Sequence, residues 1–400
     1  MLQLDAVQTL ALAGLVLFLG YALCRFIPPL SRYNLPPPVV GGLVVAVVVM
    51  LAYFQGTSLL QLDTSLQAPL MIAFFTAIGT NASLALLKVS GKQVAIFLGL
   101  ASAFAVAQNL LGMAVAMGFG LHPLFGVLAG STTLTGGPAT GLAFAPLFEQ
   151  AGVQGAESIA VTAAMAGIIL GGIVGGPAIT VMIRKHKLRG GDGSKSDSEI
   201  VVDQAIYTAP VDESRREFRA LQAIVILLLA MWAGTWVSKG IAALGLTMPA
   251  YIGAMLVGAL IRNIDDVTGW IKLPTDTIEL IGNVCLALFL SVALMNLKLW
   301  ELSGLALPLL VNLALQVLMV ILFCGVIFRA MGRDYDAAVM GGGFIGFMLG
   351  TTANAMAVMR TLTERYGVAP RAFLVAPLVG AFFIDFTNAL IITGFINFWH

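Results

Sequence analysis

The sequence is short of charge. Only 10% of its 400 residues are Asp, Glu, Lys or Arg, whereas about a quarter is usual in a soluble domain. Hydrophobic residues make up 59%, and the formal net charge of +1 gives no basic surplus that would point to nucleic acid. Because charged side chains are costly in lipid, their scarcity predicts a chain that crosses a membrane several times.

Cysteine and histidine are also scarce. Three of each are spread singly along the chain, with no pair at the spacing of a zinc site, so we expect neither a disulfide framework nor a metal centre. Walker, G-x-S-x-G and H-E-x-x-H motifs are missing too. We therefore expect a membrane transporter without a cofactor, not an enzyme. Without a nucleotide site, it is driven by an ion gradient or runs downhill.

Long apolar runs are what the sequence does contain. Ten of them approach the roughly 20 residues that a helix needs to span a bilayer. They are 8–28, 38–55, 69–87, 93–119, 157–183, 219–238, 247–261, 278–297, 304–328 and 372–396. Two more apolar segments, 122–148 and 336–360, contain clusters of Gly, Thr and Pro, which break a helix in its middle.

The basic residues indicate whether these two interrupted segments cross the membrane. If both are re-entrant hairpins and the N-terminus is outside, all 21 basic residues except Lys239 and Lys298 face the cytoplasm, which is 19 against 2. If both segments cross, the split becomes 9 inside and 12 outside. We therefore predict ten spans and two re-entrant hairpins, with both termini outside.

The two halves of the chain resemble each other. Pro38–Gly42 is similar to Pro249–Gly253, and Leu147–Val153 is similar to Leu362–Val368. In each pair the two segments occupy the same place in their halves: one opens a span, and the other follows an interrupted segment. The similarity predicts an internal repeat.

This repeat predicts an all-α polytopic membrane protein. Residues 1–183 form the first five-span repeat with its hairpin at 122–148, and residues 219–400 form the second with its hairpin at 336–360. The Gly- and Ser-containing segment 184–218 is expected to be a cytoplasmic linker. An odd number of spans inverts the second repeat, which is common in secondary transporters that work by alternating access.

The interrupted segments are the first candidate for a binding site. Broken helices present unpaired N–H groups and a positive dipole end, which can hold a carboxylate without a buried Arg or Lys. An alternative role for their glycines is close helix packing. The residues that we expect to contact a substrate here are Gly136, Gly137, Thr140, Thr351, Thr352 and Asn354.

Asp385 is the second candidate, because it lies in the middle of the last span. An acidic residue at a helix centre costs about 2.5–3.5 kcal/mol on insertion scales, so it should be paired, bound to a cation or protonated. Asn388 lies on the same helix face, and together they suit Na⁺ or the amino group of a substrate. A helix–helix hydrogen bond is the alternative. Thr133 and Asn81 are further candidate Na⁺ ligands.

Other polar residues interrupt the apolar runs, and we expect them to form hydrogen bonds between helices. They include Gln108, Asn109, Asn312 and Gln316. Lys298 and Glu301 are expected to form a surface ion pair.

Several segments resemble the bacterial sodium/glutamate symporter family, and the likeness runs from Asp5 to the last span. It is carried by Ser131–Gly141, Gly171–Pro177, Asn283–Leu302, Asp334–Val339, Thr363–Gly367 and Gly380–Leu390. The resemblance implies an inner-membrane symporter of Na⁺ and glutamate. It also implies a homodimer in which a core that carries the hairpins moves against a scaffold.

Both hairpins depart from the family pattern. The family's first hairpin reads Gly-Gly-His-Gly-Thr, where Gly136–Thr140 reads Gly-Gly-Pro-Ala-Thr. Its second carries Gly-x-Thr-Pro, where Gly350–Ala353 reads Gly-Thr-Thr-Ala. Two other interpretations therefore stay open: symport of a dicarboxylate without an amino group, and a passive channel.

The predicted topology can be tested by labelling single cysteines with an impermeant reagent. In a variant that lacks Cys24, Cys285 and Cys324, Lys195→Cys should not react from outside intact cells, because the linker is cytoplasmic. Lys298→Cys is the control that should react. Labelling of position 195 from outside would contradict the topology.

Overall fold

The computed structural model describes residues 2–57, 59–188, 190, 213–243, 245, 248–302 and 304–399. Most of this part of the chain is helical, which confirms the predicted all-α membrane protein. Two short strands, β1 (Leu2–Leu4) and β2 (Leu60–Leu62), pair in parallel near the N-terminus. Much of the predicted linker, residues 191–212, lies outside the described residues.

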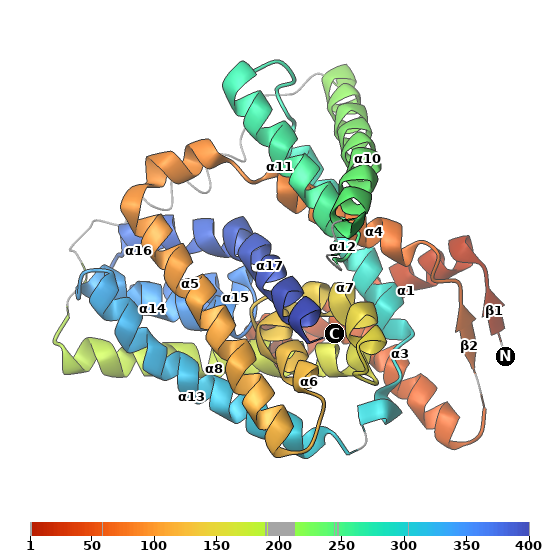
Figure 1. Ribbon diagram of the computed structural model, residues 1–400, viewed down its shortest axis with the longest axis horizontal. Helices are drawn as coiled ribbons and strands as arrows, with labels where there is room; N and C mark the ends of the chain where they lie inside the picture. Colours follow the sequence, from red (N-terminus) through yellow and green to blue (C-terminus); the bar gives the residue numbers. More distant parts are fainter. Residues whose placement is uncertain are drawn as a thin grey trace.

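The helices follow the order of the predicted spans (Figure 1). Those of the first half are α1 (Ala6–Phe26), α2 (Pro28–Arg32), α3 (Pro37–Phe54), α4 (Gln67–Thr80), α5 (Leu84–Gly118), α6 (Pro123–Val127), η1 (Leu128–Thr132), α7 (Gly137–Gln150) and α8 (Ala156–Lys185). Those of the second half are α10 (Glu213–Ala243), α11 (Tyr251–Thr268), α12 (Thr275–Met295), η2 (Leu299–Leu302), α13 (Ala306–Ala330), α14 (Tyr335–Met348), α15 (Thr352–Tyr366), α16 (Pro370–Leu378), η3 (Val379–Phe383) and α17 (Ile384–Phe398). The elements η1 and η3 are π-helical turns, and η2 is a 3₁₀ helix.

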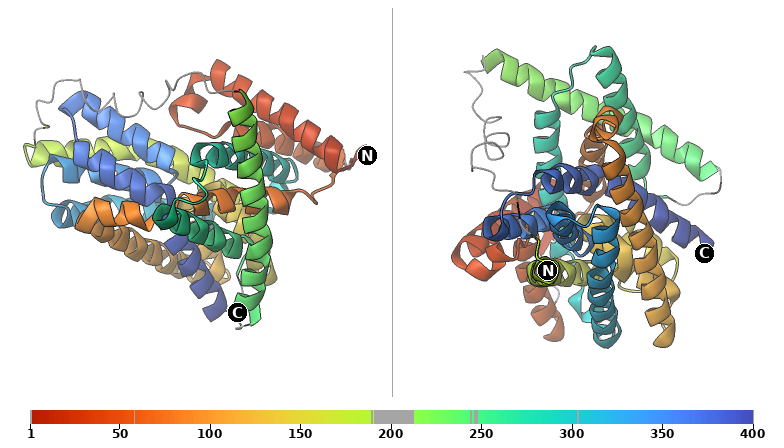
Figure 2. Two further views of the ribbon diagram at one scale, coloured as in Figure 1. Left: turned by 90° about the horizontal axis from the view of Figure 1, so that it is seen from above. Right: turned by 90° about the vertical axis from the view of Figure 1, so that its left-hand side faces the viewer.

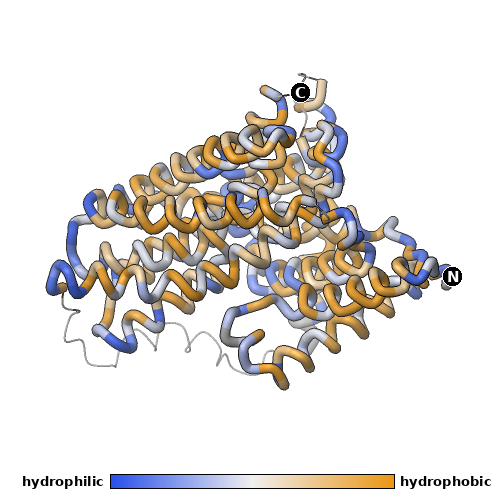
Figure 3. Tube along the Cα trace, turned by 90° about the horizontal axis from the view of Figure 1, so that it is seen from below, coloured by the Kyte–Doolittle hydropathy of each residue, from blue (hydrophilic) through white to orange (hydrophobic). Residues whose placement is uncertain are grey.

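Seven helices in the described part of the chain are long and apolar enough to cross a membrane, and they match seven of the ten predicted spans. They are α1, α3, α5, α8, α10, α12 and α13. Figure 3 shows how hydrophobic residues dominate the long helices. The other three predicted spans are shorter or interrupted: α4 has 14 residues, α11 has charged residues in its second half, and the last is divided into α16, η3 and α17. These three stay a prediction.

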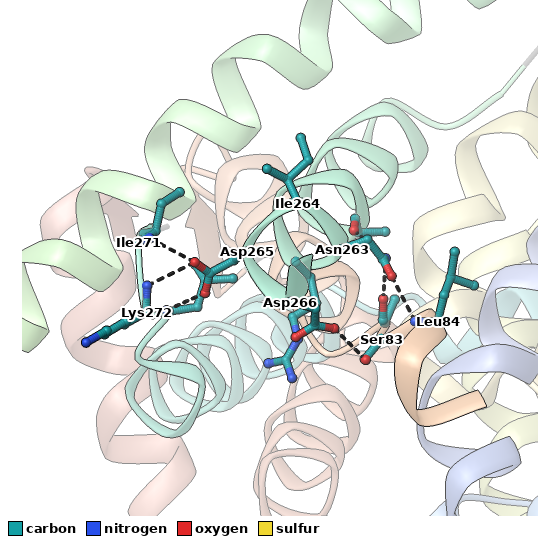
Figure 4. A network of polar contacts seen from close by, with 12 residues as sticks. Ser83, Leu84, Asn263, Ile264, Asp265, Asp266, Ile271 and Lys272 are labelled. Carbon is teal, nitrogen blue, oxygen red and sulfur yellow. Dashed lines mark hydrogen bonds and ion pairs between the residues drawn. The ribbon is translucent and has the colours of Figure 1, made fainter. Parts of the chain in front are cut away.

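The boundary of the third predicted span was wrong. It was expected to run over 69–87, but α4 ends at Thr80, and residues 84–90 form the first part of α5, which bends at Gly91. The reason is a tertiary contact with the end of α11 (Figure 4). Asn263 accepts a hydrogen bond from Leu84 N at 2.8 Å and donates one to Ala82 O at 2.7 Å.

The helices pack as two groups, which Figures 1 and 2 show from three directions. The peripheral bundle consists of α1, α3, α4, α10, α11 and α12. The central bundle consists of α5 to α8 and α13 to α17, with η1 and η3. Each half of the chain thus places its first three predicted spans in the peripheral bundle. The rest of each half, including the interrupted segment, lies in the central bundle.

An apolar interface joins the two bundles. Leu142 of α7 and Ile168 of α8 belong to one buried cluster with Phe289 and Leu294 of α12. The largest buried cluster lies mostly within the central bundle and surrounds the interrupted segments. The polar backbone of these segments is therefore shielded from lipid by protein, as irregular backbone at membrane depth requires.

Candidate functional site

The two interrupted segments meet inside the central bundle. We call residues 130–137 the first break and residues 349–352 the second break. A Cβ atom placed on Gly137 would lie 3.7 Å from Gly350 O and 3.8 Å from Thr351 Cγ2. Because α7 begins at the first break and α15 at the second, two helix N-termini with unpaired N–H groups lie next to each other.

Local sequence explains where each helix begins. Gly137 has φ +68°, a conformation that residues with a side chain rarely adopt, and Pro138 then favours the first turn of α7. At the second break, Thr351 is the N-cap of α15, and its hydroxyl accepts a hydrogen bond from Asn354 N at 3.3 Å. The predicted interruption of both segments is confirmed.

One buried glutamine connects the two breaks. Gln108 of α5 donates from Nε2 to Met348 O, at the end of α14, at 2.9 Å. Its Oε1 accepts a hydrogen bond from Thr135 Oγ1 in the first break at 2.6 Å. Gln316 of α13 donates in turn to Gln108 O at 2.8 Å. The prediction that these glutamines form hydrogen bonds between helices is confirmed: Gln108 binds at both breaks, and Gln316 binds Gln108.

Three asparagines from distant elements bind the backbone of η1. Asn109 of α5 accepts a hydrogen bond from Ser131 N, and Asn388 of α17 donates to Ser131 O, both at 2.9 Å. Asn312 of α13 donates to Ala129 O at 2.7 Å. All three side chains are fully buried. They replace the hydrogen bonds that the backbone loses where it leaves helical geometry.

Several oxygens around the first break are buried without a hydrogen-bond partner among the described residues. They are Ser131 Oγ, Thr132 Oγ1 and Asn388 Oδ1. A buried unsatisfied polar atom costs about 1–3 kcal/mol, so three of them on residues in direct contact indicate a ligand that binds oxygen. Ser131 and Thr132 were not among the site residues predicted from the sequence, although the run of hydroxyls from Ser131 to Thr133 in an apolar segment was a visible signal.

Asp385 lies one turn before Asn388 on α17 and is half-buried. No ion pair of Asp385 is found within the described ranges. Tyr251 is buried between the bundles, where its ring stacks on Phe75 of α4 at 3.8 Å and meets Phe144 of α7 edge-on at 6.0 Å. This tyrosine of α11 therefore links the two bundles through its aromatic contacts.

The other residues predicted at the second break are held by their neighbours. Thr352 donates to Gly380 O in η3 at 2.6 Å. Asn354 is fully buried and donates to Ile168 O of α8 at 2.8 Å, while its Oδ1 has no partner in the described part of the chain. The second break thus also carries a buried acceptor oxygen.

The remaining predictions differ in outcome. Thr140 is buried directly beside Gly136 in the first break. Thr133 is buried there too, but its hydroxyl donates to Leu128 O at 2.8 Å. Asn81 is exposed at the end of α4, in the peripheral bundle. The structure brings the predicted residues together around the two breaks except Asn81. The predicted ion pair of Lys298 with Glu301 is confirmed, at 3.7 Å.

Comparison with known proteins gives consistent matches. The model of the sodium/glutamate symporter family matches residues 2–368. The sodium/glutamate symporter of Haemophilus influenzae is 39% identical over 390 residues, which are 96% of this chain and 95% of that protein. That of Escherichia coli is 39% identical over 398 residues, which are 98% of this chain and 97% of that protein. The protein of the same name from Shigella flexneri matches equally.

Gly137→Ala tests the geometry of the first break. No atom would clash with the new Cβ, so the left-handed backbone alone should destabilise the variant, by about 1–2 kcal/mol. The matched control is Gly176→Ala in α8, which also has open space but an ordinary helical backbone. Thermal unfolding of the purified proteins should show a lower Tm for the first variant only. Equal Tm values would contradict the left-handed turn at Gly137.

Proposed function

The chain belongs to the sodium/glutamate symporter family, and we propose that it imports glutamate with Na⁺ across the bacterial inner membrane. Membership of this family makes it a multi-pass transporter and confirms that it is not an enzyme. Na⁺ is the coupling ion, and the family needs no organic cofactor. The observation that carries the substrate assignment is the meeting of two helix N-termini at the breaks.

Each of these N-termini can hold one carboxylate of glutamate. Gly136, Gly137 and Thr140 would contact one carboxylate, and Thr351 and Thr352 the other, through backbone N–H groups and hydroxyls. Two adjacent N-termini without a basic side chain match a substrate with two carboxylates better than one with a single carboxylate. Asn354, buried behind the second break, would support that end of the substrate.

Asp385 favours glutamate over a dicarboxylate without an amino group. Its carboxylate forms no ion pair within the described ranges, and it is half-buried one turn from Asn388, which binds the first break. A substrate ammonium would provide the missing positive partner. A carboxylate without such a partner would add only repulsion to a doubly anionic substrate.

The coupling ion is assigned to the first break. Na⁺ binds oxygen, and unwound backbone carbonyls commonly contribute to such sites in transporters. Ser131 Oγ, Thr132 Oγ1 and Asn388 Oδ1 are the buried oxygens that need a partner there, and Asp385 lies one turn away. In this proposal Ser131 and Thr132 take the place that the sequence analysis gave to Thr133 and Asn81, since the Thr133 hydroxyl is engaged and Asn81 lies apart.

Alternating access would move the central bundle as an elevator against the peripheral bundle. The division of each half of the chain between the two bundles supports inverted repeats, 1–183 and 219–400, with re-entrant hairpins at 122–148 and 336–360. The apolar interface of Leu142 and Ile168 with Phe289 supports sliding, because these side chains make non-directional apolar contacts. The peripheral bundle would form the homodimer.

Uptake into proteoliposomes tests the proposed function. With an imposed inward Na⁺ gradient, labelled glutamate should accumulate above its equilibrium level. Replacing Na⁺ by K⁺ or choline, without a proton gradient, should reduce uptake to that of protein-free vesicles. Unlabelled glutamate should compete more strongly than glutamine or succinate. Uptake that persists without Na⁺ would contradict symport, and a lack of saturation would indicate a passive channel.

Asp385→Asn tests the role of the carboxylate. The change keeps the shape and removes the charge, so folding should survive while glutamate affinity falls about 10- to 100-fold, as for a lost charged hydrogen bond. Inhibition by succinate, which has no ammonium, should become stronger, because the repulsion by the carboxylate is removed. Asp276→Asn, at an exposed position on α12, is the control that should bind glutamate normally. Wild-type glutamate affinity and Na⁺ dependence would reduce Asp385 to a structural residue.

A further inference from the structure

A second cavity lies away from the breaks, between α8 and α13. Its volume is about 300 Å³. Its walls are mostly apolar and include Ile179 and Met182 of α8 and Ile321 and Phe328 of α13. Val181, at its edge, is 65% exposed, so the cavity opens onto the side of the helices, where the protein meets lipid.

The rim of this cavity is basic. Lys185 and His186 follow the apolar wall of α8, and Arg329 follows that of α13. All three are exposed, and no acidic residue is among the described residues that line the cavity. Neither Lys185 nor Arg329 forms an ion pair within the described ranges. No ion pair among the described residues therefore neutralises the positive charge of the rim.

The position of the rim matches the surface of a bilayer. Both α8 and α13 are long enough to cross a membrane, and the rim lies in the last turn of each. By the positive-inside rule this end faces the cytoplasm. An apolar wall below a pair of cations at this depth complements a phospholipid, whose apolar acyl chain lies below its anionic phosphate.

Helix dipoles explain only part of this arrangement. Basic residues at helix C-termini are stabilising by themselves, so Lys185 and Arg329 have a reason to be there without any ligand. That reason does not account for the hollow between the helices, where a Cβ on Gly325 would meet no atom within 4 Å. The larger cavity of about 870 Å³ near η2 is lined by Glu149, Glu157 and Glu301 with one lysine, Lys298, so the charge of its lining is net negative.

We propose that the cavity between α8 and α13 binds an anionic phospholipid of the inner leaflet. Its phosphate lies between Lys185 and Arg329, and an acyl chain fills the hollow beside Gly325 against Ile321 and Phe328. Basic pockets between transmembrane helices at the cytoplasmic side recognise anionic lipid head groups in this way. Because both helices belong to the central bundle, the lipid stays with that bundle. The proposal does not depend on which substrate is transported.

Lipid titration of the purified full chain in neutral detergent tests the charged rim. Bound phosphatidylglycerol, counted by native mass spectrometry, is compared with phosphatidylcholine of the same acyl chains. Removing two cations in Lys185→Gln/Arg329→Gln should weaken phosphatidylglycerol binding roughly 10- to 30-fold. The control Lys272→Gln/Arg360→Gln removes the same charge from other exposed positions and should bind as the wild type does.

Gly325→Leu tests the hollow, because the new side chain would occupy the place of the acyl chain. It should lower phosphatidylglycerol binding while the Tm without lipid stays at the wild-type value. Gly99→Leu, on α5 with equally open surroundings, is its control. The proposal is overturned if either cavity variant binds phosphatidylglycerol as the wild type does, or if phosphatidylcholine binds equally well. It is also overturned if inorganic phosphate at the same concentration displaces the lipid, since the site would then bind only an anion.

Discussion

The arrangement of the central bundle depends on one constraint: backbone polar groups at membrane depth must be paired. Both interrupted segments leave helical geometry, and each unpaired N–H or carbonyl group would cost several kcal/mol in lipid. Buried amides from α5, α13 and α17 provide the missing bonds. Gln108 binds the end of α14 and the turn before α7 at the same time, so the two breaks are held next to each other.

The same bonds prepare the proposed binding site. A helix N-terminus attracts an anion only if its N–H groups point at the ligand without reorganisation, and the amides hold α7 and α15 in that position. No basic side chain is needed for the substrate carboxylates, which avoids a buried charge when the site is empty. The buried oxygens of Ser131, Thr132 and Asn388 keep their acceptor capacity, because only the backbone of Ser131 is used by its neighbours.

The two bundles differ in what holds them together. Within the central bundle, hydrogen bonds join elements far apart in sequence, and these bonds resist displacement. Between the bundles, Asn263 of α11 binds Leu84 N at the start of α5, whereas the contacts beside the breaks are apolar, through Leu142 and Phe289, and aromatic, through Phe144 and Tyr251. Apolar contacts lose little free energy when one surface moves along another of similar character. A bundle that moves as a rigid body against a fixed one requires this difference: strong directional bonds within it and weaker, non-directional contacts around it.

The sequence by itself determined the features that depend on local composition. Hydropathy located seven of the ten predicted spans, and glycine, threonine and proline located both breaks, because helix propensity and transfer into lipid act over one turn or one span. Only the tertiary structure decided which polar residues meet. Gln108 and Met348 are 240 positions apart, and Asn388 and Ser131 are 257 apart. The end of α4 at Thr80 and the separation of Asn81 from the breaks were decided in the same way. These pairings depend on how whole helices pack, and a periodic pattern in one helix carries no information about its partner.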